Sequence, residues 1–136
     1  MYRLSNLLSA EDAIKVLEKG YALEALMYDN TPRIGTWGTA NDHFRHAKYL
    51  MALSRQREVI EQLYLAANAA IAFDNRPEEE KTNSLLLGEQ IHKKTDWDTA
   101  DSRSLCEIIR DSWLSDEVFD AIRDAKEFKE FVDRLK

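Results

Sequence analysis

The stretch that decides the fold of this 136-residue chain is ANDHFRHAKYLMALSRQREVIEQLYLAANAAIAF, residues 40–73. Apolar residues recur at helical spacing over 40–54 and again over 57–73, on either side of a short turn at 54–56. Two helices joined by so short a turn fold back on each other as an antiparallel αα-hairpin. Alanines in the second helix would let the two backbones approach closely. The sequence therefore predicts an all-α fold built around this hairpin.

A further helix is expected before the hairpin, over residues 10–28, with Ser9 as its N-terminal cap. Its apolar stripe is wide, because Val16, Leu23 and Met27 flank the residues at strict helical spacing. A stripe of this width predicts that the helix is buried on two sides.

After the hairpin, residues 74–98 read best as an irregular connection that carries one apolar plug, Leu85-Leu86-Leu87, while 82–87 could also form a strand or a helix. A fourth helix is expected over 100–114, followed by a short helical turn capped by 115–117. Asp124 begins a pattern similar to a capping box, which predicts a last helix.

Composition narrows the class of protein. The chain is 44% hydrophobic and 32% charged, has one cysteine, and is long enough for one domain, residues 1–136. No apolar run approaches the ~18 residues of a membrane span, and no signal-peptide core is apparent. A single cysteine favours a reducing cytoplasm. The net charge of −6 is concentrated after residue 60, so we expect no nucleic-acid binding by these residues themselves.

Candidate chemistry is sparse. His43 and His46 are three residues apart on one helix and could share a metal, but no third ligand has a suitable offset. Cys106 reads as a half-buried structural residue, and Trp37 and Trp113 read as core residues rather than ligand-stacking aromatics. We therefore expect no enzyme activity, no metal and no cofactor.

The hairpin resembles a tetratricopeptide repeat, in which small residues mark the crossing of two helices. Ala47 and Ala66 occupy those small positions, and Ser54 stands where the turn glycine is usual. His43 and Leu50 depart from the aromatic residues of the repeat consensus. The resemblance implies an array of about two hairpin repeats with a C-terminal capping helix pair.

Longer strings are similar to the C-terminal tetratricopeptide-like region of bacterial XRE-family (Cro- and lambda-repressor-like) helix-turn-helix regulators, in the form common in clostridia. They are AIAFD at 70–74, TNSLL at 82–86, and EVFDAIRD at 117–124 continuing to Phe128. The resemblance covers about residues 40–136. It implies a non-catalytic sensor domain that binds a protein or peptide or mediates oligomerisation, with DNA bound only through a helix-turn-helix that we do not find in this chain.

By similarity to such repeats, the first helix of the hairpin would line a concave binding wall. Its expected solvent-facing residues are Asn41, Arg45, Lys48 and Met51, and Arg45 and Lys48 lie three apart, suited to a carboxylate or an acidic segment. Ordinary surface charges are the alternative reading of that pair.

Three other functions stay open at this point: a stand-alone tetratricopeptide-like adaptor unrelated to transcription, a metal-dependent enzyme that uses His43 and His46, and a purely dimeric scaffold.

Overall fold

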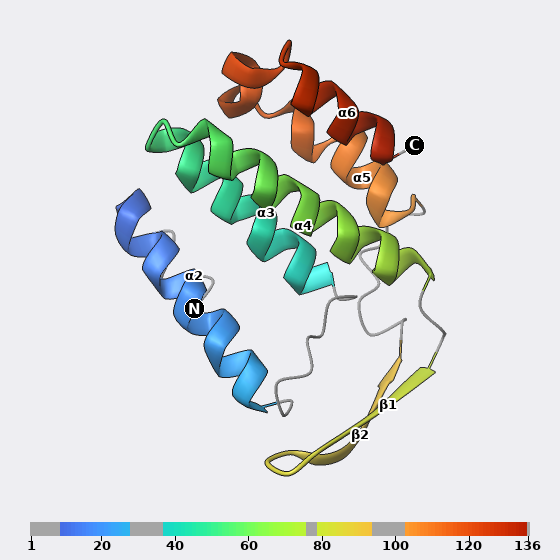
Figure 1. Ribbon diagram of the computed structural model, residues 1–136. Helices are drawn as coiled ribbons and strands as arrows, with labels where there is room; N and C mark the ends of the chain where they lie inside the picture. The colour runs from blue at the N-terminus through green and yellow to red at the C-terminus, as the bar shows by residue number, and fades with distance from the viewer. Residues whose placement is uncertain (1–8, 28–36, 76–78, 94–102, 136) are drawn as a thin grey trace.

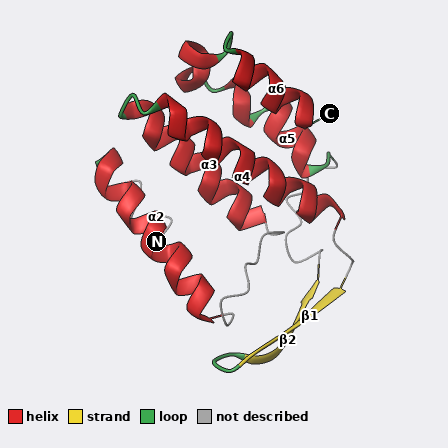
Figure 2. Cartoon of the chain, viewed as in Figure 1, coloured by secondary structure: helices red, strands yellow, loops and turns green. Residues whose placement is uncertain are grey.

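The computed structural model describes residues 9–27, 37–75, 79–93 and 103–135. These residues are mostly helical, as the sequence predicts, with one β-hairpin (Figure 2). The elements in chain order are α2 (Ala10–Met27), α3 (Trp37–Ala52), α4 (Gln56–Asn75), β1 (Glu79–Ser84), β2 (Gly88–Lys93), α5 (Leu105–Asp111), the 3-10 helices η2 (Trp113–Ser115) and η3 (Glu117–Ile122), and α6 (Lys126–Arg134).

Helices α3 and α4 form the central antiparallel hairpin, which confirms the main structural prediction (Figure 1). Ala47 on α3 and Ala66 on α4 are both fully buried, as expected of residues where two helix backbones approach closely. Ser54 in the connecting turn has a φ of 58°, a left-handed conformation that glycine adopts without strain. A glycine at this position would therefore relieve the strain.

The helices form three layers, with α2 on one side of the α3–α4 hairpin and α5, η3 and α6 on the other (Figure 1). The C-terminal layer is held by aromatic contacts: the Phe119 ring lies 5.4 Å from that of Phe44 on α3, and the Phe131 ring lies 5.6 Å from that of Tyr64 on α4. Because the rings meet at tilted and edge-on angles, they pack as aromatic pairs prefer.

A side chain from α4 fixes the start of α5. Both carboxylate oxygens of Asp74 accept hydrogen bonds from the first backbone N–H groups of α5, from Leu105 at 2.8 Å and from Cys106 at 3.0 Å. The Ser104 hydroxyl accepts a third, from Glu107 at 3.2 Å. These groups have no partner within the helix itself, so Asp74 ties the C-terminal layer to the end of the central hairpin.

Three expectations about individual segments are wrong. Residues 79–93 form an antiparallel β-hairpin rather than an irregular connection, and Leu85 and Leu86 at its turn are exposed rather than plugged into a core. In α2 only Ala13, Ile14 and Leu17 are buried, so among the described residues this helix is covered on one side rather than on two.

The third concerns the last helix. Its N-terminal cap position is Ala125 rather than Asp124, and no side chain caps it. Asp116 instead caps η3, because its carboxylate accepts a hydrogen bond from the Val118 N–H at 3.0 Å, as expected for the helical turn after 115–117. The fourth helix was expected to begin at residue 100, but residues 100–102 lie outside the described residues. Within the described residues the helix α5 begins at Leu105.

Candidate functional site

The α3 surface expected to line a binding wall is largely occupied by contacts within the chain. Asn41 is buried, so the expectation that it faces solvent is wrong. Arg45 donates a hydrogen bond to the Tyr49 hydroxyl at 2.9 Å, and Met51 packs against the core. The Lys48 ammonium lies 2.9 Å from the carboxylate of Asp116.

The Lys48 and Asp116 pair joins α3 to the start of η3 in the C-terminal layer. The Val118 N–H and the Lys48 ammonium together hold the pKa of Asp116 below its usual range. Both side chains are about a third exposed or more, so the pair contributes at most ~1 kcal/mol of stability. Binding of a partner by Arg45, Lys48 and Met51 stays a prediction.

A cluster of aromatic and polar side chains lies between α2, α3 and α4. The Tyr21 ring of α2 stacks on His43 and His46 of α3, with centroids 5.0 and 6.1 Å apart. The Tyr21 hydroxyl lies 3.4 Å from Nδ1 of His46, and Nδ1 of His43 donates to the side-chain amide oxygen Oε1 of Gln62 on α4 at 2.8 Å. We call these four residues the tyrosine–histidine cluster.

Burial sets the protonation states of the cluster. Burial lowers the pKa of His43, and the hydrogen bond to Gln62 partly offsets this shift. Burial also lowers the pKa of His46, and the neighbouring His43 lowers it further. Burial, and then the carboxylates of Asp42 and Glu18, raise the pKa of Tyr21. The imidazoles and the phenol are therefore neutral at pH 7, which suits rings packed in a helix interface.

The two histidines were the candidate metal ligands. Among the residues that the structure describes, no group of three histidine, cysteine, aspartate or glutamate side chains is placed to hold a metal ion. The ring nitrogens named above already make contacts within the protein. What the arrangement does chemically is join α2 to the central hairpin through polar groups.

Cys106 is half-buried, as the sequence indicates. Burial, and then the hydrogen bond and negative charge of Asp74, raise the pKa of its thiol to about 12. At neutral pH the group is therefore a thiol, which is a poor nucleophile.

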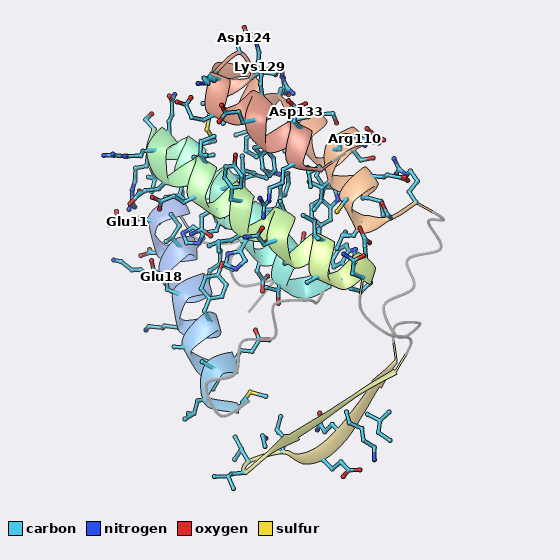
Figure 3. The ribbon with its side chains drawn as sticks, turned by 45° about the vertical axis from the view of Figure 1, so that its right-hand side comes forward. Glu11, Glu18, Arg110, Asp124, Lys129 and Asp133 are labelled. Atoms are coloured by element: carbon cyan, nitrogen blue, oxygen red, sulfur yellow. The ribbon has the colours of Figure 1, made fainter. Side chains whose placement is uncertain are left out.

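A groove of about 570 Å³ lies between the η2 region and α6, and sequence reasoning did not find it. Its walls are Arg110, Leu114, Ser115, Arg123, Phe128, Lys129, Val132 and Asp133. Arg110, Lys129 and Asp133 project from the outer side of α5 and α6, away from Glu11 and Glu18 on α2 (Figure 3).

Two of the three cations around this groove are engaged in contacts within the chain. Arg123 donates to the carbonyl oxygens of Leu114 and Asp116 and to the carboxylate of Asp120, while Arg110 pairs with Asp111. Arg123 therefore holds η2 and η3 together. The apolar stripe of α6 signals only its core-facing side, because Phe128 and Phe131 are buried, so no local sequence pattern marks this groove.

No family model, no curated protein and no solved structure matches this chain. Within the described residues, no helix combines the length and the apolar character that a bilayer crossing requires.

Proposed function

We propose that this chain is a tetratricopeptide-like protein-interaction or oligomerisation domain of a helix-turn-helix transcriptional regulator, without catalytic activity. The observation that carries the proposal is the layered stack: the α3–α4 hairpin crosses on buried alanines and is covered by helices on both sides. A helical hairpin cannot bury its apolar faces alone, and stacking neighbours on it is how helical-repeat domains gain stability. Such stacks present surfaces for other proteins.

The chemistry of the candidate reactive groups supports a non-catalytic role. His43 is neutral and bonded to Gln62, and the Cys106 thiol is protonated at neutral pH. We also propose that the protein is cytoplasmic, because its single cysteine forms no disulfide within the chain and fits a reducing compartment.

The proposed link to the regulator family rests on the strings AIAFD and EVFDAIRD. Within the first, Asp74 supplies the cap of α5, and within the second, Phe119 packs on Phe44 and Arg123 ties η2 to η3. Residues shared with that resemblance thus perform the structural tasks that assemble the C-terminal layer.

The test is to read the coding frame on the 5′ side of Met1 and to express the whole frame. We expect a helix-turn-helix segment there, and we expect the full protein to bind DNA more weakly when residues 40–136 are deleted. A frame without such a segment would refute the link to transcription and indicate a stand-alone adaptor. Retained DNA affinity after the deletion would refute a role in assembling the regulator.

A further inference from the structure

Two apolar segments far apart in the sequence lie exposed at one end of the molecule. In both views the turn between β1 and β2 lies at the same end as the C-terminal end of α2 (Figures 1 and 3). Leu85 and Leu86 in that turn are 98% and 66% exposed, and Leu23 and Leu26 near the end of α2 are 51% and 66% exposed. With Ile91 of β2, which is 50% exposed, we call these residues the leucine surface.

The β-hairpin that carries three of the five residues of this surface is incomplete as a sheet. In the described part of the chain β1 pairs only with β2, over six residue pairs from Glu79 with Lys93 to Ser84 with Gly88. An isolated two-stranded hairpin is marginally stable in water, and each of its strands has one edge open for pairing. The hairpin therefore gains stability from any partner that covers its turn or pairs with an edge.

We infer that the leucine surface is the binding site for a second copy of this chain, in a two-fold symmetric dimer. The inference rests on the proposed function, of which it specifies the oligomerisation surface. In a two-fold dimer the same patch of both subunits meets itself, so the turn leucines of one copy cover the end of α2 in the other, and the reverse. Each copy thus supplies what the other leaves exposed.

The size of the surface fits a dimer interface. Five large aliphatic side chains that are half or more exposed present on the order of 500 Å² of apolar area per chain, against about 800 Å² per partner in a standard interface. The remainder is supplied by the polar rim and the open strand edges, as in ordinary interfaces with an apolar centre. The exposed apolar area is at the upper end of what a monomeric surface carries.

The charges of the hairpin also suit a second copy. The Lys81 ammonium and the Glu89 carboxylate lie 3.3 Å apart on one side of the hairpin, and both side chains are about two thirds exposed. The charges of residues 79–93 nearly balance, with three glutamates against two lysines, and Lys81 of one copy can pair with Glu89 of the other. A surface that presents both signs in this way is complementary to itself, although the chain as a whole carries a charge of −6.

The test is sedimentation velocity of the purified chain over a range of about 1 to 200 μM, with light scattering for mass. We expect a dimer whose dissociation constant rises about 100-fold or more in the double variant Leu85→Asp/Leu86→Asp, because two buried leucines are replaced by charges. Leu26→Asp on α2 is an independent variant with the same expected direction. The matched control is Leu65→Asp, an exposed leucine of α4 outside the leucine surface, which should leave the dimer unchanged.

Circular dichroism on each variant verifies that the helices are retained. A wild-type chain that stays monomeric up to 200 μM would overturn the inference, and so would a dimer that tolerates both the hairpin and the α2 variants. If the chain is monomeric but its full frame encodes a helix-turn-helix, the dimer inference fails and the proposed function is retained. If the chain forms the dimer but the frame encodes no helix-turn-helix, the proposed function fails and the dimer surface is retained.

Discussion

Replacing Asp74 with alanine should destabilise the protein by about 3 kcal/mol. Its two carboxylate oxygens accept hydrogen bonds of 2.8 and 3.0 Å from the first N–H groups of α5. A hydrogen bond to a charged acceptor contributes about 1.5–3 kcal/mol, and the charge also interacts favourably with the helix dipole. Asp74 is only half-buried, so water partly replaces the lost acceptors, and the total falls near the lower end of the roughly 3–6 kcal/mol expected for two such bonds.

The assay is urea unfolding followed by circular dichroism, with thermal unfolding alongside it. For a chain of this length we expect the melting temperature to fall by about 10 °C. Asp74→Asn keeps one acceptor oxygen and loses the charge, so its stability should lie between those of wild type and Asp74→Ala. The matched control is Asp111→Asn, whose carboxylate pairs only at the surface with Arg110 and should change stability by less than about 0.5 kcal/mol.

Cys106 provides a second measurement of the same contact. Burial is the largest cause of its raised pKa, and Asp74 supplies the next two. Removing the carboxylate should therefore lower the pKa of the thiol and speed its reaction with a disulfide reagent at pH 8. An Asp74→Ala protein as stable as wild type, with unchanged thiol reactivity, would refute the role assigned to Asp74.

Three further predictions concern the central hairpin. Ser54→Gly should raise the free energy of unfolding by about 0.5–1 kcal/mol, because a φ of 58° is unstrained only for glycine; an unchanged or lower urea midpoint would contradict this. Ala47→Leu should cost about 2–3 kcal/mol by forcing the two helices apart, measured by urea unfolding against the exposed substitution Ala52→Leu. Stability should fall as the pH drops below about 6.5, because burial lowers the pKa of His43 and His46 and the unfolded chain then binds more protons; the slope is at most ~1.4 kcal/mol per pH unit for each histidine, and it should be reduced in the His43→Gln/His46→Gln variant.

The spacing of apolar residues along the chain was sufficient to predict the helices. The hairpin of α3 and α4, its turn at Ser54 and its alanine crossing follow from residues that lie near one another in the sequence. The N-terminal cap of α2 was equally predictable from the sequence, since the Ser9 hydroxyl accepts a hydrogen bond from the Asp12 N–H at 3.3 Å. Helix formation depends mainly on residues three and four apart, so a single sequence carries this information.

What covers each helix was decided only by the tertiary structure. The apolar stripe of α2 is wide enough to be buried on two sides, yet one side has no covering element among the described residues, and Leu23 and Leu26 remain exposed. Asn41 reads as a surface residue from its spacing, but it is buried in the folded chain. Burial depends on neighbours that are distant in sequence, and periodicity does not identify them.

The candidate site likewise combines residues that the sequence identified with residues that only the tertiary structure brought to it. The sequence marked His43 and His46 through their spacing, but Tyr21 and Gln62, which hold them, come from other helices. Asp74 acts on backbone groups 31 residues away, beyond any local pattern. The sequence left 82–87 open between strand and helix and did not identify the hairpin of β1 and β2, because its polar strands lack the apolar alternation of a half-buried sheet. Sequence alone therefore determined the helical hairpin, while long-range packing and hydrogen bonding decided how the layers join and which surface stays open.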